Sequence, residues 1–228
     1  MIPRVLIDTA EIPGAFAEGG GQLKLFRRGD EFSIMLGGNE LMNSRLSGSE
    51  EALATLACAR LAGKSGVHIA IGGLGMGFTL RAALHALPAD ARIVVAELVP
   101  SVIAWAEGPM AEIFGDSLSD ARLTIAQQDV GVLIDNAEGS FDAILLDVDN
   151  GPDGLTRASN DRLYGAIGLA RARKALRAGG LLLVWSSGPS PMFTARLKNA
   201  GFIVEEQVVR ATRSGRGARH IIWVATAP

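Results

Sequence analysis

From residue 67 to residue 200, short apolar segments alternate with segments in which apolar residues recur at helical spacing. We expect strands over residues 67–71, 92–97, 122–127, 141–147 and 180–186, and helices over residues 78–87, 99–107, 130–136, 160–177 and 191–200. Strands that are apolar along their whole length and separated by helices form parallel sheets with helices on both faces. The alternation therefore predicts an α/β protein with a doubly wound, mainly parallel sheet.

The two ends of the chain follow other patterns. Apolar segments at residues 202–209 and 220–225 are joined by a basic loop without a helix, which predicts an antiparallel hairpin at the sheet edge and a total of seven strands. Residues 1–47 alternate short apolar runs with glycine-rich breaks, as β-hairpins do. We expect a small N-terminal β-hairpin region over residues 1–47 and a Rossmann-like domain over residues 48–228.

The segment over residues 67–77 is the strongest indication of a ligand. It reads Val-His-Ile-Ala-Ile-Gly-Gly-Leu-Gly-Met-Gly, with glycine at Gly73, Gly75 and Gly77, and it leads directly into an expected helix. Glycine permits a sharp turn after a strand and lets the backbone approach a ligand without an intervening side chain. The free amides at the start of the next helix then face that ligand. A tight strand-to-helix turn without a ligand is the alternative interpretation.

Glu97 stands twenty residues after Gly77, at the end of the next expected strand, where a carboxylate can accept both hydroxyls of a ribose. The third glycine of a dinucleotide fingerprint is replaced by Phe78, which disfavours NAD without excluding it. No Gly-Lys-Ser/Thr sequence follows the glycines, so a P-loop is not predicted. A ligand with a ribose and no pyrophosphate remains, and S-adenosylmethionine or a derivative is the commonest such ligand on this layout.

Acidic residues follow two further strands. In doubly wound sheets, ligands bind beyond the carboxyl ends of the strands. Asp129 is placed either to accept the exocyclic amine of adenine or to cap the following helix. Asp147 and Asp149 lie two residues apart in an extended segment, so both side chains point to the same side, into the expected cleft. Alternatively, the two side chains cap the start of the turn at residues 150–152 and bind no ligand.

Carboxylates beside a sulfonium donor suit group transfer to an amine. A carboxylate can take the proton of the amine, and its charge stabilises a cationic transition state. The leaving thioether is neutral and needs no acid, so most of the rate comes from alignment and exclusion of water. Trp185 is a candidate wall of the acceptor pocket or a core residue. Met42 begins a segment that could form the edge of a lid.

Composition limits the classes of function. The net charge of −2 and the pI of about 5.9 give no general attraction to nucleic acid or to an anionic membrane. The single cysteine, Cys58, fits a buried helical face, and one cysteine with three scattered histidines predicts neither a disulfide framework nor a metal site. The N-terminal residues contain neither a signal peptide nor a membrane span, so we expect a cytoplasmic protein.

Four short motifs occur in order along the chain. They are Ile-Gly-Gly-Leu-Gly-Met-Gly at residues 71–77 with Thr-Leu-Arg at 79–81, Ala-Glu-Leu at 96–98, Gln-Asp-Val at 128–130 and Leu-Asp-Val-Asp-Asn-Gly-Pro at 146–152. In order, they resemble the glycine-rich turn, ribose-binding acid, adenine-side acid and catalytic loop of the spermidine synthase family. This family of aminopropyltransferases is built on the class I S-adenosylmethionine methyltransferase fold. The resemblance covers nearly the whole chain.

The resemblance implies roles for particular residues. Gly73, Gly75 and Gly77 would cradle the donor, Glu97 would bind its ribose and Asp129 its adenine. Asp147 would act as base or would stabilise the cation. Asp149, or Tyr164 in a Leu-Tyr pair that resembles a Phe-Tyr pair of the family, would position the acceptor.

The chain also departs from the family. No acid stands among residues 74–76, where the family has an Asp that holds the ammonium of the aminopropyl donor. The second Asp of the catalytic loop is at 149 rather than 150, Gly-Ser-Glu at 48–50 replaces a Tyr-His-Glu gate, and Tyr164 is the only tyrosine. These departures favour methyl transfer from S-adenosylmethionine to a small, amine-bearing acceptor.

Three alternatives remain open at this stage. The first is aminopropyl transfer from decarboxylated S-adenosylmethionine, and the second is binding of an adenosyl ligand without catalysis. The third is an NAD-linked oxidoreductase. The expected partner is a small-molecule acceptor, with no nucleic acid and no membrane, and the apolar N-terminal hairpins are candidates for pairing in a homodimer.

Overall fold

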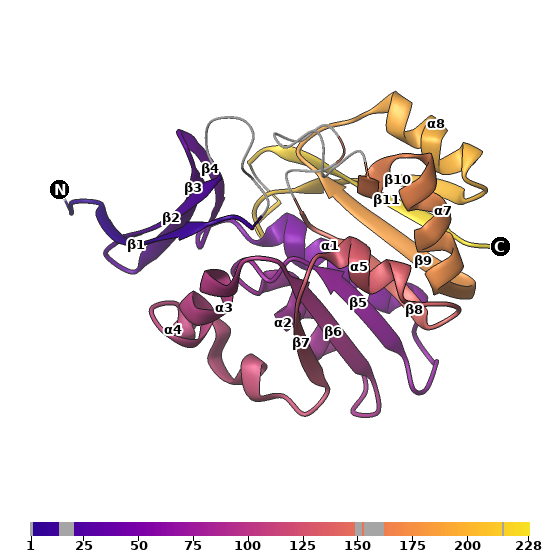
Figure 1. The fold of residues 1–228 in the computed structure, drawn as a ribbon, viewed down its shortest axis with the longest axis horizontal. Helices are drawn as coiled ribbons and strands as arrows, with labels where there is room; N and C mark the ends of the chain where they lie inside the picture. The colour runs from indigo at the N-terminus through magenta and orange to yellow at the C-terminus, as the bar shows by residue number, and fades with distance from the viewer. Residues whose placement is uncertain (1, 14–20, 149–151, 153–161, 216) are drawn as a thin grey trace.

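The computed structural model describes residues 2–13, 21–148, 152, 162–215 and 217–228 (Figure 1). Residues 2–43 contribute a four-stranded antiparallel sheet in the order β1-β2-β3-β4. Its strands are β1 (Val5–Glu11), β2 (Gln22–Arg28), β3 (Glu31–Leu36) and β4 (Asn39–Asn43). This sheet matches the β-hairpins that the sequence predicts for the N-terminal region.

A second sheet has seven strands in the order β10-β11-β9-β8-β5-β6-β7. Its strands are β5 (His68–Gly72), β6 (Arg92–Glu97), β7 (Leu123–Gln127), β8 (Phe141–Leu146), β9 (Leu176–Ser186), β10 (Ile203–Arg210) and β11 (Arg219–Thr226). The pairs among β5 to β9 are parallel, and β11 joins β9 and β10 in antiparallel register. The predicted fold class, a mainly parallel seven-stranded sheet with an antiparallel hairpin at its edge, is confirmed.

Helices cover both faces of this sheet. They are α1 (Gly48–Arg60), α2 (Phe78–Ala86), α3 (Pro100–Glu107), α4 (Ala111–Phe114), α5 (Val130–Asp135), α7 (Ala166–Ala175) and α8 (Pro191–Asn199), with the 3-10 helix η1 (Gly115–Ser119). The buried side chains of α1, α2 and α3 belong to one core cluster, and those of α5, α7 and α8 belong to the other. The sheet therefore separates two helical layers.

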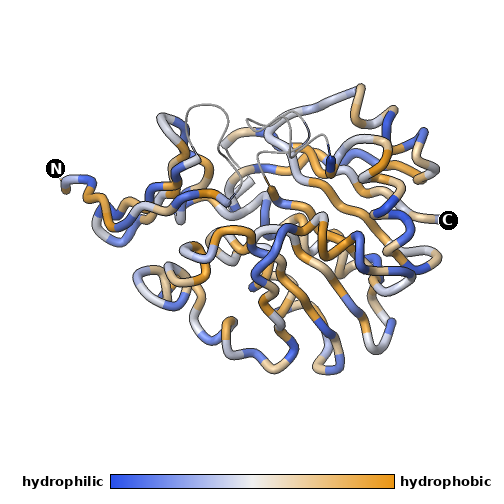
Figure 2. Tube along the Cα trace, viewed as in Figure 1, coloured by the Kyte–Doolittle hydropathy of each residue, from blue (hydrophilic) through white to orange (hydrophobic). Residues whose placement is uncertain are grey.

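Alternation of side chains along the strands creates the two cores. In β5, Ile69 and Ile71 face the α1 side, whereas Ala70 between them faces the α5 side. In β8, Leu145 faces the α1 side and Leu146 faces the α5 side. Because both faces are buried, the central strands are apolar along most of their length (Figure 2).

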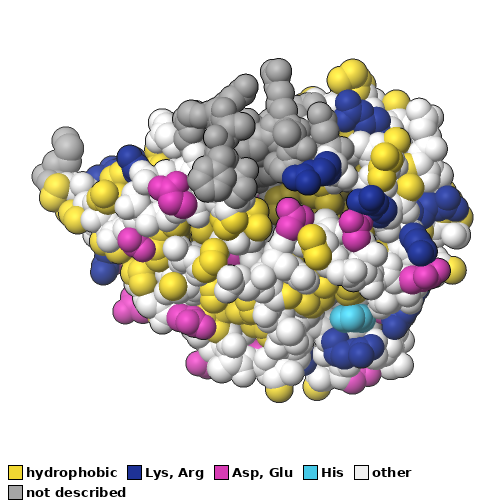
Figure 3. All heavy atoms as spheres, in the orientation of Figure 1, with side chains coloured by type: hydrophobic (Ala, Val, Ile, Leu, Met, Phe, Trp, Pro, Cys, Tyr) yellow, Lys and Arg dark blue, Asp and Glu magenta, His cyan; other side chains and the backbone are white. Residues whose placement is uncertain are grey.

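The N-terminal sheet packs one face against the core and exposes its first strand. Leu25 and Ile34 are buried in the cluster that includes α1 and α2. By contrast, Val5, Leu6 and Ile7 of β1 are exposed, at the end of the molecule that lies left in Figures 1 and 3. On the face shown in Figure 3, basic side chains are interspersed with acidic and apolar ones. The domain boundary after residue 47 stays a prediction.

One predicted boundary is wrong. The helix expected over residues 160–177 ends at Ala175, and its first residues lie outside the described part of the chain. Leu176 instead pairs with Phe141 of β8, after which the register shifts and Leu181 pairs with Ala143. The strand therefore begins earlier than residue 180 and contains a bulge. Leu176 also fits a helical pattern, so spacing alone could not place the boundary.

We predict that Gly77→Ala destabilises the fold more than Gly139→Ala. Both glycines have positive φ, 73° and 52°. A Cβ at Gly77 would lie 2.7 Å from Cδ1 of the buried Phe114, whereas no atom of the described residues lies within 4 Å of a Cβ at Gly139. Urea denaturation should show an additional loss of about 2 kcal/mol for Gly77→Ala. Equal losses in the two variants would show that Phe114 does not require glycine here.

Candidate functional site

The candidate site lies where the carboxyl ends of β5 and β8 meet. The chain passes from β5 to β6 and β7 on one side, and then returns to place β8 on the other side of β5. The backbone amide of Asp147 donates to the carbonyl of Gly72 over 3.3 Å, which keeps the segment after β8 beside the glycine turn. Ligands bind at such reversals of strand order in doubly wound sheets.

The turn after β5 requires glycine at alternate positions. Gly73, Gly75 and Gly77 have φ values of 87°, 50° and 73°, which other L-residues rarely adopt. A Cβ at Gly73 would lie 2.9 Å from the carbonyl oxygen of Asp147, and one at Gly75 would lie 2.8 Å from Cε of Met42. Close packing within the protein therefore contributes to the requirement for glycine at these positions, in addition to any approach of a ligand.

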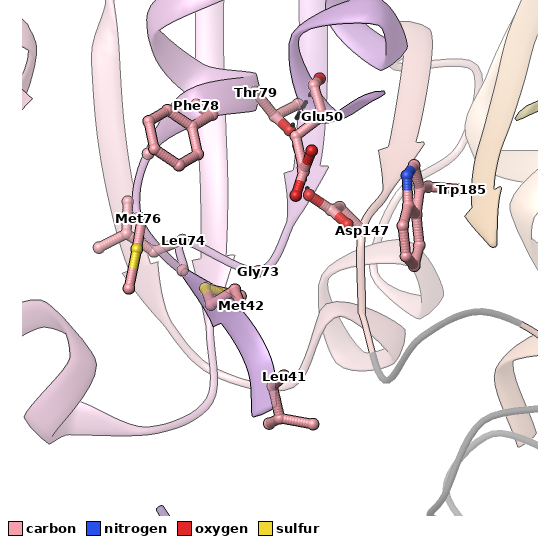
Figure 4. Close-up of a pocket in the computed structure, with 12 residues that line it drawn as sticks. Leu41, Met42, Glu50, Gly73, Leu74, Met76, Phe78, Thr79, Asp147 and Trp185 are labelled. Carbon is pink, nitrogen blue, oxygen red and sulfur yellow. Dashed lines mark hydrogen bonds between the residues drawn. The ribbon is translucent and has the colours of Figure 1, made fainter. Parts of the chain in front are cut away.

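A cavity of about 80 Å³ lies between the glycine turn, β4, the start of α1 and the ends of β8 and β9 (Figure 4). It is lined by Leu41, Met42, Glu50, Gly73, Leu74, Gly75, Met76, Gly77, Phe78, Thr79, Asp147 and Trp185. Sites for small molecules usually have volumes of roughly 300 Å³ or more. An adenosyl ligand would therefore require side chains such as Met42 and Leu41 to move away from the turn.

Two carboxylates share this cavity. Figure 4 shows the side chains of Glu50 from α1 and Asp147 from the end of β8 turned toward one another. Burial and the nearby charge of Glu50 raise the pKa of Asp147 to about 7. Burial also raises the pKa of Glu50, against the effect of a 2.8 Å hydrogen bond that Ser49 Oγ donates to Glu50 Oε2. Near neutral pH, the pair therefore holds a proton that it can exchange.

Thr79 joins the elements that carry the two acids. Its Oγ1 lies 3.2 Å from Oδ2 of Asp147 and 3.2 Å from the carbonyl oxygen of Glu50. The hydroxyl has one hydrogen to donate, so it serves either acceptor at a given moment. Donation to Asp147 favours the ionised carboxylate and partly offsets the effect of burial on its pKa.

Glu97 lies beneath the glycine turn rather than on the cavity wall. Its Oε2 accepts from the amide of Leu74 and its Oε1 from the amide of Val99, each over 2.8 Å. The residue is 7 % exposed, and burial raises the pKa of its carboxyl group against the opposing effect of these bonds. The backbone amides of Gly75 and Leu98 also act on this carboxylate and lower its pKa, so Glu97 serves the glycine turn and the start of α3 in the described structure. Contact with a ribose stays a prediction for Glu97.

Asp129 caps α5, which is one of its two predicted uses. Its Oδ1 accepts from the amide of Gly131 over 2.6 Å, as the side chain of an N-cap residue does. Asp129 follows β7 at the same edge of the sheet, but it does not line the cavity. Contact with adenine stays a prediction for this residue.

The two residues predicted to position the acceptor are not part of the described cavity. Asp149 lies outside the described residues. Tyr164 is 1 % exposed and belongs to the core on the α5 side, where its ring meets Phe193 edge to face with centroids 5.6 Å apart. A contact between Tyr164 and an acceptor therefore stays a prediction.

Sequence reasoning did not single out Glu50 as a site residue. In this fold, a helix that precedes a parallel strand begins at the carboxyl edge of the sheet, because it runs antiparallel to that strand. The first turn of α1 therefore projects toward the same edge as the glycine turn. Acidic residues in that first turn were the available signal, but they are also common at helix N-termini for electrostatic reasons.

Trp185 forms the wall of the cavity opposite the glycine turn (Figure 4). It is 8 % exposed, and its Nε1 has no hydrogen-bond partner among the described residues. Its ring meets the imidazole of His220 edge to face, with centroids 4.8 Å apart. Trp185 therefore has features of both predicted roles, because it is a wall of the cavity and is also nearly buried.

In the described part of the chain, no group of His, Cys, Asp and Glu side chains is arranged to hold a metal ion. None of the described helices is long and apolar enough to cross a membrane.

Comparison with known proteins establishes the fold. No protein-family model and no curated protein sequence matches the chain. A spermidine synthase in complex with the transition-state analogue AdoDATO superposes with a TM-score of 0.73 at 16 % identity, over 98 % of this chain and 72 % of that one. The spermidine synthase from Thermotoga maritima gives a TM-score of 0.74 at 17 % identity, over 98 % and 73 % of the two chains.

A probable spermidine synthase from Corynebacterium glutamicum ATCC 13032 gives a TM-score of 0.66 at 17 % identity, over 95 % of this chain and 81 % of that one. The chain therefore has a spermidine synthase-like fold, and the resemblance inferred from the sequence motifs is confirmed at that level.

We predict that Asp147→Asn changes how stability depends on pH. The pKa of Asp147 is raised from 3.8 to about 7 in the folded protein, so between these values the unfolded chain releases a proton that the folded chain keeps. The contribution of Asp147 is fully present below pH 4 and is lost as pH rises through 7. Relative to wild type, Asp147→Asn should gain about 4 kcal/mol between pH 4 and pH 8, measured by urea denaturation.

The matched control is Asp116→Asn, because Asp116 is exposed and lies outside the cavity. Its unfolding free energy should follow that of wild type across this pH range. If the curves of Asp147→Asn and wild type also run parallel, Asp147 does not titrate near neutrality.

Proposed function

We propose that this protein is a transferase that uses an adenosyl sulfonium donor, and that its reaction is aminopropyl transfer from decarboxylated S-adenosylmethionine to a small amine. The sequence motifs favoured methyl transfer, with aminopropyl transfer as the alternative. The charge of the cavity now favours the alternative. We also propose that residues 1–47 form a separate N-terminal region that covers the donor.

The observation that carries the choice of donor is the sign of the charges in the cavity. Glu50 and Asp147 line it, and no Lys, Arg or His side chain is among the described residues that line it. S-adenosylmethionine has a carboxylate that these acids would repel, whereas its decarboxylated form presents only a sulfonium and an ammonium. Opposite charges about 4 Å apart attract by several kcal/mol at the effective dielectric constant of a protein surface.

Glu50 supplies an acid that the glycine turn lacks. Residues 74–76 contain no carboxylate, which was the reason for preferring methyl transfer. Glu50 reaches the same cavity from the first turn of α1, and its charge acts on Asp147. We assign the donor ammonium to Glu50 on this basis.

The remaining roles follow from position in the fold. Gly73, Gly75 and Gly77 would cradle the donor, with Glu97 at its ribose and Asp129 at its adenine. Asp149 or Tyr164 would position the acceptor. The glycine turn fits an adenosyl ligand only when Met42 moves aside, because the thioether of Met42 lies against Gly75.

Asp147 has the properties of a general base for this reaction. The acceptor arrives as an ammonium ion and must lose a proton before its nitrogen can attack. A base is most effective when its pKa lies near the working pH, and the pKa of Asp147 is about 7. The amine nitrogen forms a bond to the aminopropyl carbon of the donor while the bond between that carbon and sulfur breaks. The sulfur leaves as a neutral thioether.

Calorimetry with both donors, followed by product analysis, tests this proposal. We expect tighter binding of decarboxylated S-adenosylmethionine than of S-adenosylmethionine, and formation of methylthioadenosine when a diamine is added. Asp147→Asn should lower kcat by about 10²- to 10⁴-fold, and it should also weaken binding of the donor cation because one of the two cavity carboxylates is lost. Asp116→Asn should leave both unchanged.

Other outcomes identify the other candidates. Tighter binding of S-adenosylmethionine and release of S-adenosylhomocysteine would establish methyl transfer, which the absence of an acid at residues 74–76 still favours. Binding of either donor without turnover of any amine would indicate a non-catalytic adenosyl-binding protein.

A further inference from the structure

A chain of polar side chains leads away from the cavity. Ser49 Oγ donates to Glu50 Oε2 over 2.8 Å, and His220 Nδ1 lies 2.9 Å from the same Ser49 Oγ. Glu50 and Ser49 belong to the first turn of α1, whereas His220 is the second residue of β11. The contact spans 171 residues of sequence.

Burial divides this chain into an inner and an outer part. Ser49 is 0 % exposed, so its hydroxyl contacts only protein groups. His220 is partly exposed, and its other ring nitrogen, Nε2, makes no hydrogen bond to any described residue. His220 therefore connects a buried hydroxyl with solvent.

The proposed reaction requires such a connection. Each transfer to an ammonium acceptor releases one proton next to Asp147, in a cavity of about 80 Å³. The carboxylates can hold this proton, but the next turnover requires that it leave. A closed site that excludes water also removes the solvent route for protons.

We propose that Ser49 and His220 form a proton relay that carries the proton released by the acceptor amine from Asp147 and Glu50 to solvent at β11. This inference rests on the proposed function, because only a reaction that releases a proton in the cavity needs the relay.

The transfer is balanced in protons and changes no bond between heavy atoms. Asp147 first passes its proton to the carboxylate of Glu50, which faces it in the cavity. Protonated Glu50 then gives its proton to Ser49 Oγ while Ser49 gives its own to Nδ1 of a neutral His220, whose ring hydrogen is on Nε2. The resulting imidazolium loses the Nε2 proton to water, which leaves the ring hydrogen on Nδ1, and rotation of the partly exposed ring toward solvent returns it to the Nε2 form before the next transfer. At the end, Glu50 is ionised and again accepts the hydrogen bond from Ser49, as in the structure.

The surroundings of the relay suit this direction of transfer. Burial is the cause that lowers the pKa of His220, so the ring is neutral near pH 7 and its imidazolium form gives up a proton readily. The groups packed against the ring are Ser49 and the uncharged Trp185, with Val209 opposite in β10. On the inner side, Asp147 and Glu51 face Glu50, and Glu51 is itself paired with Arg213.

The decisive variant is His220→Asn. An asparagine amide can occupy the place of Nδ1 and keep a hydrogen bond to Ser49, but it cannot take up and release a proton. We expect kcat to fall about tenfold or more with KM unchanged, and added imidazole to restore much of the loss. His85→Asn is the control, because His85 is exposed on α2 and lies outside the cavity.

A second measurement does not depend on turnover. Nitrogen NMR of His220 should show a ring whose Nδ1 signal changes when Ser49 is replaced by alanine, because the relay requires their hydrogen bond in solution. An Nδ1 signal that is insensitive to Ser49→Ala would overturn the proposal.

The outcomes separate this inference from the proposed function. Failure of the wild-type protein to turn over any donor and amine would refute the proposed function, and the relay with it. An active wild type with an equally fast His220→Asn, at every pH from about 6 to 9, would refute the relay alone. A slow His220→Asn that keeps the wild-type melting temperature and does not respond to imidazole would also refute it, because the loss of rate would then not come from missing proton transfer.

Discussion

The parallel pairing of β5 with β6 on one side and β8 on the other is the constraint on which the site depends. This pairing fixes the glycine turn after β5 against the segment after β8. The amide of Gly73 donates to the carbonyl of Ala96, and the amide of Asp147 donates to the carbonyl of Gly72. These backbone bonds set the distance between the turn and the Asp147 carboxyl. The proposed transfer of a group from the donor to an amine beside Asp147 depends on that distance.

The acid pair shows how function opposes stability in this fold. Burial raises the pKa of both Glu50 and Asp147, with a further rise from the charge of Glu51 on Glu50 and of Glu50 on Asp147, and the free energy of these shifts destabilises the folded state once pH exceeds their ordinary pKa values. A cationic ligand between them would remove the repulsion. The same electrostatics that weaken the free protein therefore select the charge of the ligand.

The C-terminal hairpin holds the helix that carries Glu50. The amide of Gly48 donates to the carbonyl of Ala211 over 2.9 Å, and a Cβ at Gly48 would lie 2.5 Å from the backbone of Thr212. Arg213 pairs with both carboxylate oxygens of Glu51. The basic loop between β10 and β11 thus positions the first turn of α1.

The sequence alone determined the parallel sheet, the glycine turn and the acids at strand ends, because these follow from the local period of apolar residues and from backbone angles that glycine alone adopts easily. It misplaced the start of β9, since Leu176 suits a helix as well as a strand. Only the tertiary structure brought Glu50 to the cavity and His220 to Ser49 behind it. Glu50 comes from α1 and His220 from β11. No local pattern encodes which distant elements meet, because packing of the complete core decides that.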